Sequence, residues 1–287
     1  MTASLWTNCQ ANISLLFGEL AFERRPEAAA RAGFDAIECW WPFAGPAPSD
    51  READAFVASV RDAGVRLRGL NFFAGDMPAG QRGIMSDPRR RKEFDEAVAA
   101  AMEIGRQLDV PLFNALYGNR STELSPREQD EAALGALVHA AEQAYVLDAT
   151  VLVEPVSGVD AYPIKLASDA VRVVDQANRA AKHGRVLMLA DLYHLHVNGD
   201  DVARVVTQDT AWIGHVQIAD APGRREPGTG RAPVSDWVDA LAAAGYSGTI
   251  GLEYLPSGDT VSGLQWLNEL NPAIGRRGPA ETEGASR

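Results

Sequence analysis

Four polar residues interrupt apolar segments in the second half of the chain, and their side-chain types suit a shared metal ion. Successive members are 37, 26 and 36 residues apart, which is close to one per strand-and-helix unit. Three carboxylates and an amide that converge in one place are unfavourable unless a cation neutralises them. Such an all-oxygen set suits Mg²⁺ or Mn²⁺ better than a structural Zn²⁺. The four are Glu154 in VLVEP, Asp191 in VLMLAD, Gln217 in GHVQIAD and Glu253 in IGLEY.

Other polar side chains are candidates for contacts around that ion or with a substrate. His215 precedes Gln217 by two residues, so both side chains point to the same face of the strand. There we expect His215 either to supply a nitrogen ligand to the metal or to contact the metal ligands. His194 follows the sixth apolar run closely enough to reach a substrate. Arg82 offers the positive charge that a carboxylate substrate needs. Each of these residues, taken alone, also suits a structural role, such as a helix cap or a surface ion pair. For Glu38, the sequence does not decide which face of its strand the side chain takes.

The elements that must position these residues alternate along the chain. Eight short apolar runs, each followed by a loop and a longer helix-prone segment, start 28 to 45 residues apart. Several runs do not alternate between polar and apolar residues, which is typical of parallel strands buried on both faces. The runs cover about residues 6–11, 36–41, 67–72, 112–117, 150–154, 186–191, 214–219 and 249–254.

Helix boundaries support the same architecture. Capping boxes begin at Ser49 and Ser125, and Asp87 precedes a proline that favours a helix start. Three helical segments end in a glycine just before the next strand, at Gly33, Gly64 and Gly245.

We therefore predict a single-domain (β/α)₈ TIM barrel over residues 1–270, with its active site at the carboxyl ends of the strands. A doubly wound open sheet is the alternative, but neither G-x-G-x-x-G nor a Walker A sequence is present. Two long connections, at 73–87 and 219–234, follow the third and seventh runs and are expected on the catalytic face. We expect the first of them to close over the site, and the polar segment 271–287 to be a disordered tail.

Composition narrows the class of partner. The 287 residues include 39 acidic and 27 basic side chains, so a net charge of −12 disfavours nucleic acid and anionic membranes as partners. No run of 18 apolar residues and no signal-peptide pattern occur. The two cysteines, Cys9 and Cys39, form no C-x-x-C pair, and we expect a cytoplasmic protein. The sequence leaves a homo-oligomer open.

From about residue 8 to residue 270, the chain resembles the hydroxypyruvate isomerase family of the xylose isomerase-like barrel superfamily. The His-x-Gln-Ile-Ala-Asp and Glu-Pro-Gly-Thr-Gly segments are fairly specific to this branch. The matching segments are ANISLLFGE at 11–19, AGDMPAGQRG at 74–83, VEP at 153–155, DLYH at 191–194, HVQIAD at 215–220, EPGTG at 226–230 and LEY at 252–254.

The resemblance implies a metal-dependent aldose–ketose isomerisation of hydroxypyruvate to tartronate semialdehyde. The metal would bind the carbonyl and hydroxyl oxygens of the substrate and stabilise an enediolate. Glu154 and Glu253 would act as acid and base in the proton transfer. The four residues that match the family's metal ligands are Glu154, Asp191, Gln217 and Glu253.

The resemblance also implies residues that contact the substrate. His194 matches the family's helper histidine, and Asn71 matches an asparagine on the third strand. Members of the family can carry a histidine just before that asparagine, whereas this chain has Leu70. This departure concerns the substrate contact on the third strand, and hence the substrate, but not the metal site.

Related functions are alternatives. A 2-oxo-tetronate isomerase or a ketose 3-epimerase would use the same metal and glutamates, and only the shape of the pocket separates them. A barrel endonuclease would need three metals, many histidines and a basic face, which five histidines and a charge of −12 disfavour. A non-enzymatic barrel that binds a sugar acid would not need both glutamates.

Overall fold

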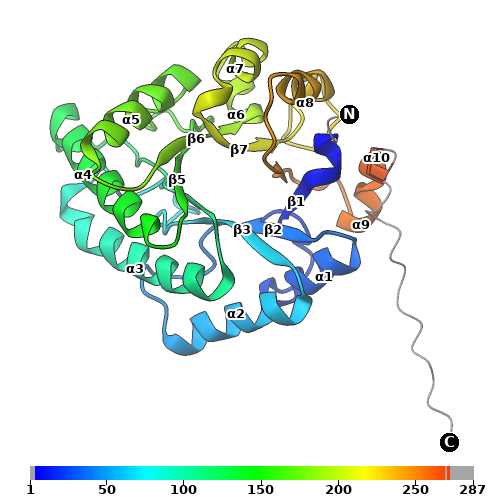
Figure 1. The fold of residues 1–287 in the computed structure, drawn as a ribbon, viewed down its shortest axis with the longest axis horizontal. Coiled ribbons are helices and arrows are strands. Elements are labelled where there is room, and N and C mark those ends of the chain that lie inside the picture. Colours follow the sequence, from blue (N-terminus) through cyan, green and yellow to red (C-terminus); the bar gives the residue numbers. More distant parts are fainter. Residues whose placement is uncertain (1–3, 269, 272–287) are drawn as a thin grey trace, which may run out of the picture.

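The computed structural model describes residues 4–268 and 270–271. Apart from Asn271, the segment expected to be a tail lies outside the described residues. Eight parallel strands form a closed barrel in chain order, and β1 pairs with both β2 and β8 (Figure 1). The predicted (β/α)₈ TIM barrel is therefore confirmed.

Each predicted apolar run overlaps one strand of the barrel, but the first run was placed too early. The Thr7 amide and hydroxyl both donate to the Ser4 carbonyl oxygen, at 3.0 and 2.7 Å. This turn winds Leu5–Asn8 into a 3₁₀ helix, so β1 begins only at Cys9. The strands are β1 Cys9–Asn12, β2 Ala36–Cys39, β3 Arg66–Asn71, β4 Leu112–Asn114, β5 Thr150–Val153, β6 Val186–Asp191, β7 Ile213–Ile218 and β8 Ile250–Leu252.

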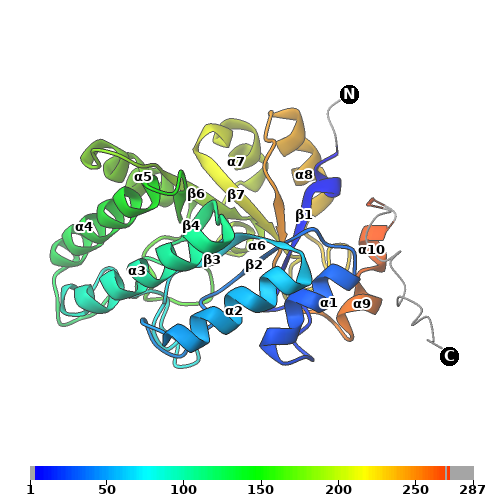
Figure 2. The same cartoon turned by 60° about the horizontal axis from the view of Figure 1, so that its bottom comes forward.

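Helices surround the barrel (Figures 1 and 2). Both predicted capping boxes form, at Ser49 and Ser125, and the three predicted terminal glycines adopt positive φ angles of 97°, 69° and 89°. Short 3₁₀ helices lie at Phe22–Arg24, Pro88–Arg90 and Thr210–Trp212. The helices are α1 Arg25–Arg31, α2 Asp50–Ala63, α3 Arg91–Leu108, α4 Pro126–Tyr145, α5 Ala167–Ala180, α6 Leu192–Val197, α7 Val202–Gln208, α8 Val234–Ala243, α9 Thr260–Gly263 and α10 Gln265–Asn268.

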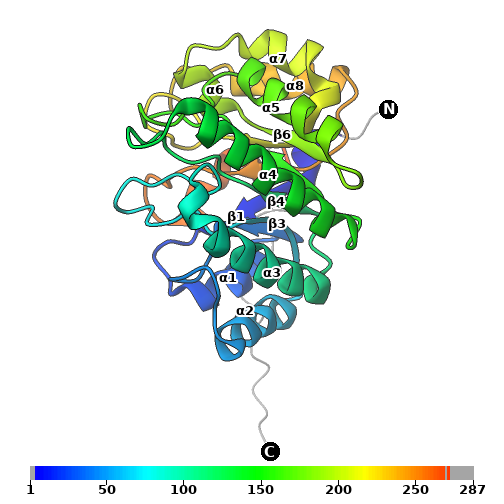
Figure 3. The same ribbon diagram turned by 90° about the vertical axis from the view of Figure 1, so that its left-hand side faces the viewer.

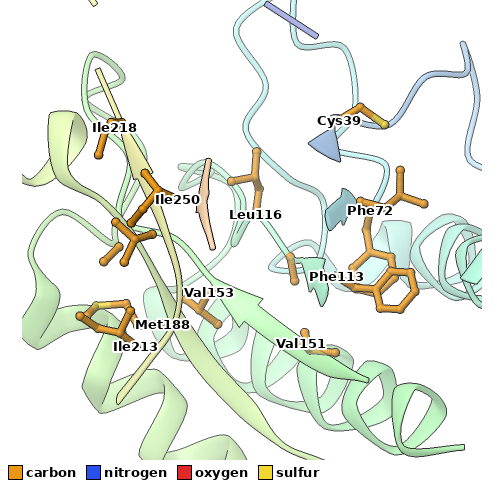
Figure 4. Packing of buried hydrophobic residues seen from close by; sticks show 14 of the residues in the cluster. Cys39, Phe72, Phe113, Leu116, Val151, Val153, Met188, Ile213, Ile218 and Ile250 are labelled. Atoms are coloured by element: carbon orange, nitrogen blue, oxygen red, sulfur yellow. The ribbon is translucent and has the colours of Figure 1, made fainter. Parts of the chain in front are cut away.

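The hydrophobic core includes residues of the strands, the surrounding helices and the loops. Phe72 and Phe113 stack with ring centroids 5.6 Å apart (Figure 4). Phe94 of α3 packs edge-on against Phe72. Cys9 and Cys39 are buried free thiols. Within the described ranges, no helix has the length and apolar character needed to cross a bilayer.

The connections that follow the strands gather on one side of the barrel (Figure 3). Among them is the segment 73–87, which is held by hydrogen bonds within itself and to the connection after β4. The Gly83 amide donates to the Ala74 carbonyl oxygen, and the Ser86 amide donates to that of Tyr117. The loop thus has a defined path over the catalytic face.

Candidate active site

Three buried carboxylates stand at the carboxyl ends of their strands. Glu154 directly follows β5, Asp191 is the last residue of β6, and Glu253 directly follows β8. They are 5%, 1% and 3% exposed, respectively. Oxygen atoms of Glu154 and Asp191 and a nitrogen atom of His194 lie within 4.8 Å of one another, as the ligands of one metal ion would.

Glu154 and Glu253 border a small cavity of about 110 Å³ at the mouth of the barrel. Because pockets for drug-sized ligands measure roughly 300–1,000 Å³, this cavity suits only a small molecule. The loop at 73–87 contributes two side chains to its wall. The lining residues include Glu154, Glu253, His194, Asn71, Arg82, Arg224, Trp40 and Met77.

Arg224, which we did not predict, is the cation closest to the carboxylates among the described residues. Its Nη2 atom lies 2.5 Å from Glu253 Oε1 and 3.2 Å from Asp191 Oδ2. Its side chain is 17% exposed, so both ion pairs are shielded from solvent. Arg224 therefore partly neutralises the site and points a guanidinium group into the cavity.

The loop at 219–234 holds Arg224 in place. The Asp220 carboxylate accepts hydrogen bonds from the amides of Gly228 and Gly230 at 2.8 and 2.9 Å. The Glu226 carboxylate accepts from the amide and the hydroxyl of Ser257 at 2.8 and 2.6 Å, which ties this loop to the one after β8. In the sequence, the feature that could have pointed to Arg224 as a site residue was its position in a long loop that follows a strand.

The two glutamates resist ionisation where they lie. Burial, together with the charge of Asp191, raises the pKa of Glu154 to about 8, although a hydrogen bond from Asn114 opposes this shift. Burial also raises the pKa of Glu253 well above its ordinary value, against the attraction of Arg224. Carboxyl groups with perturbed pKa values in a cavity are typical of acid–base chemistry. A further cation in the cavity would stabilise their ionised form.

His194 is suited to donate a hydrogen bond to a substrate. Its Nδ1 atom accepts from the Ser157 amide at 3.2 Å, so the proton of the neutral ring sits on Nε2. Burial lowers the pKa of His194 to about 4, which keeps the ring neutral at pH 7. Nε2 lies 3.6 Å from Asp191 Oδ2 and 3.8 Å from Glu154 Oε1. Because a metal ligand needs a bare nitrogen, this tautomer favours substrate binding over metal binding.

Gln217 and His215 lie on β7 and turn toward the barrel interior. The Gln217 amide donates from Nε2 to Glu38 at 2.7 Å, and its buried Oε1 has no hydrogen-bond partner within the described residues. His215 Nε2 lies 2.6 Å from Glu38 Oε2. His215 lines an inner cavity with Gln217 and Glu38 and, as far as the structure describes the chain, does not line the small cavity at the mouth. His215 therefore contacts the mouth cavity only indirectly, through the residues that it binds.

Glu154 and Glu253 at the mouth, together with Gln217 of the inner cavity, fit a divalent cation. The raised pKa values of both glutamates and the free Gln217 oxygen mark a surplus of oxygen donors, which Mg²⁺ and Mn²⁺ prefer. Asn71 and Arg82 both reach the cavity, whereas Leu70 does not line it in the described part of the chain. Leu70 instead lines the inner cavity together with Gln217.

A family model described as xylose isomerase-like TIM barrel matches residues 26–270. A Streptomyces coelicolor protein named "Putative hydroxypyruvate isomerase" is 46% identical over 89% of this chain and 94% of its own length. The hydroxypyruvate isomerase of Escherichia coli is 31% identical, over 90% and 97%. A 2-oxo-tetronate isomerase of Cupriavidus necator is also 31% identical, over 93% and 98%.

A solved structure has the same fold at high similarity. The Brucella melitensis protein, titled as an AP endonuclease of family 2, superimposes with a TM-score of 0.83 at 30% identity. The match covers 92% of this chain and 99% of that protein. The sequence relatives and this structure therefore agree on one barrel family.

Proposed function

Since the chain belongs to the hydroxypyruvate isomerase family of xylose isomerase-like TIM barrels, we propose that it interconverts hydroxypyruvate and tartronate semialdehyde with a divalent metal. Its relatives are named as isomerases, which supports the assignment of this chain as an isomerase. The observation that carries the specific reaction is the small cavity lined by two buried glutamates with raised pKa values and by two arginines.

The proposed reaction is a proton transfer between adjacent carbons. One glutamate removes a proton from C3 of hydroxypyruvate, the carbon that bears the hydroxyl group, which leaves a planar enediolate. The other glutamate returns a proton to C2, while the hydroxyl proton moves from O3 to O2, so no oxidant or reductant is needed. Each positioned transfer contributes about 10²–10⁴-fold. Glu154 and Glu253 perform these two steps.

The remaining residues hold the substrate and balance its charge. We assign the metal ligands to Glu154, Asp191, Gln217 and Glu253, and the bound Mg²⁺ or Mn²⁺ supplies Lewis-acid polarisation of the substrate carbonyl group. His194 donates from Nε2 to a substrate oxygen. Arg82 and Asn71 face the same cavity, where a guanidinium group pairs well with the substrate carboxylate.

Arg82→Ala is expected to lower kcat/KM for hydroxypyruvate by about 10–100-fold, mainly through a higher KM. The Arg82 guanidinium is held by the carbonyl oxygens of Met77 and Gln81, and hydrogen bonds to a charged partner contribute about 1.5–3 kcal/mol. Steady-state kinetics at saturating metal measures the effect. The exposed Arg127 of α4 gives the matched control, and Arg127→Ala should leave both constants unchanged. An unchanged KM in Arg82→Ala would remove Arg82 from substrate binding.

The size of the cavity favours a short substrate. A second hollow of about 810 Å³ adjoins it, lined by aromatic residues including Trp41 and Phe73. Trp40 and Met77 line both spaces, and we infer that they form the partition between them. A longer substrate would have to pass this partition, so we propose that it limits chain length.

Met77→Ala is expected to raise kcat/KM for a 2-oxo-tetronate relative to hydroxypyruvate by about tenfold or more, since one methylene group in a pocket changes selectivity by about 10–200-fold. Competition between the two substrates, followed by NMR, measures the ratio. Pro78→Ala is the control, because Pro78 is exposed and borders only the larger hollow. A ratio in Met77→Ala equal to that of the wild type would show that the partition does not set chain length.

The second candidate function is a 2-oxo-tetronate isomerase. It rests on the relative of that name and on the hollow beyond the partition, which has room for a fourth carbon. The wild-type preference between the two substrates decides between these functions.

A further inference from the structure

One buried acidic side chain in the barrel interior has no part in the proposed proton transfer. Glu38 of β2 is 3% exposed, and four side chains surround its carboxylate. Gln217 Nε2 and Asn12 Nδ2 donate to Oε1 at 2.7 and 3.1 Å, and His215 Nε2 lies 2.6 Å from Oε2, to which Gln10 also donates. This cluster lies directly beside two residues of the proposed metal site.

The carboxylate of Glu38 accepts hydrogen bonds from three amide side chains. Gln217 Nε2, Asn12 Nδ2 and Gln10 Nε2 each donate to one of its two oxygens. Because these contacts take N–H donors, each amide has to turn its NH₂ group toward Glu38.

This requirement settles the orientation of the Gln217 amide. The amide has one side that donates and one that accepts, and Glu38 takes the donating Nε2 side. Oε1 is therefore left over, buried and without a partner among the described residues. Only this oxygen can bind a cation, because the NH₂ group has no free electron pair to offer.

Glu38 also reaches Glu253 through Asn12. The two protons of Asn12 Nδ2 go to Glu38 Oε1 and, at 2.8 Å, to Glu253 Oε2. Asn12 Oδ1 accepts from the Ser14 amide at 3.1 Å, which prevents the side chain from turning over. One buried carboxylate thus holds the Gln217 amide directly and contacts Glu253 through Asn12.

The barrel wall leaves room for this carboxylate. Gly251 of β8 faces the cluster, and a Cβ atom there would lie 2.5 Å from Glu38 Oε1 and 2.9 Å from Gln217 Cγ. Both distances are shorter than real Cβ contacts, so any side chain at this position would displace one of the two groups.

We propose that Glu38 is a positioning residue that turns the Gln217 carbonyl oxygen and the Glu253 carboxylate toward the metal, and so sets the affinity of the site. The proposal rests on the metal site of the proposed function. In Glu38→Gln, the neutral amide at position 38 can donate to Gln217 Oε1. Gln217 is then free to turn over and present its NH₂ group, which cannot bind the ion.

The test measures Mn²⁺ binding to the full-length, metal-free protein by isothermal titration calorimetry. Glu38→Gln is expected to weaken binding about 10–100-fold, as the loss of partners of metal ligands typically does. Gly251→Ala should weaken binding as well, because it displaces the cluster while keeping the charge. Glu131→Gln, on the exposed face of α4, is the matched control and should bind like the wild type. Circular dichroism checks that each variant is folded.

Rescue separates positioning from a merely structural role. A carboxylate has an oxygen on both sides, so Gln217→Glu in the Glu38→Gln background should restore Mn²⁺ affinity whichever way the side chain turns. Wild-type affinity in folded Glu38→Gln, or no recovery in the double variant, would overturn the proposal. If Glu38→Gln does not fold, wild-type affinity in Gly251→Ala would overturn it. If the wild-type protein binds no Mn²⁺, the proposed metal site itself is overturned. This outcome differs from a loss of binding that is confined to the variants.

Discussion

Glu253→Gln is expected to lower kcat for hydroxypyruvate isomerisation by about 10²–10⁴-fold, the usual contribution of a positioned proton-transfer group. The substitution keeps the shape of the side chain but removes its ability to carry the proton. Trp40, Asn12 and Arg224 all donate to Glu253, so its carboxylate is held in one geometry at the cavity. Assays of hydroxypyruvate turnover at saturating Mn²⁺ or Mg²⁺ would measure kcat.

Because Glu253 is also a proposed metal ligand, the assay needs a control for metal occupancy. Mn²⁺ titration of Glu253→Gln gives the concentration at which the site is filled, and kcat is compared there. Glu103→Gln, at an exposed position of α3, should retain wild-type turnover. Turnover near the wild-type rate in metal-loaded Glu253→Gln would contradict the two-glutamate mechanism.

Divalent metal is expected to bind more tightly as the pH rises, up to about the pKa of Glu154. Burial raises that pKa to about 8, so below it the carboxyl group of the metal-free protein is protonated. The metal requires the carboxylate, and each bound ion therefore releases at least one proton. The proton released by Glu154 alone should raise the affinity about tenfold per pH unit, or about 100-fold between about pH 6 and about pH 8, and this contribution should level off above that range.

Calorimetry of Mn²⁺ binding in buffers of different ionisation enthalpy counts the released protons directly. Glu154→Gln should bind the ion more weakly and lose its own share of the proton release. A wild-type affinity that stays constant across this range would mean that Glu154 is already ionised without the metal.

The spacing of polar residues in apolar runs was enough to predict that three of the candidate site residues stand at one end of the barrel. Glu154, Asp191 and Glu253 each fall at the carboxyl end of a strand, because parallel strands in a closed barrel all end at one mouth. Helix starts at Ser49 and Ser125 were equally predictable, since a capping box depends only on residues within one turn.

Side chains whose placement depends on distant parts of the chain were not predictable. Arg224 lies in a loop that Asp220 folds onto the Gly228 amide and that Glu226 ties to Ser257, 31 positions along the chain. The face taken by Glu38 was open because β2 is buried on both sides and shows no alternation. His215 was expected at the site, and its actual partner, Glu38, lies 177 positions away in the chain.

The most direct test of the proposed function is an isomerisation assay with hydroxypyruvate. The purified protein is assayed with EDTA, and with Mn²⁺ or Mg²⁺, beside a panel of 2-oxo-tetronates and ketoses, and tartronate semialdehyde is detected by NMR. We predict metal-dependent conversion of hydroxypyruvate that outpaces every other compound in the panel. No conversion of hydroxypyruvate, with turnover of a four-carbon acid or a ketose instead, would contradict the assigned substrate.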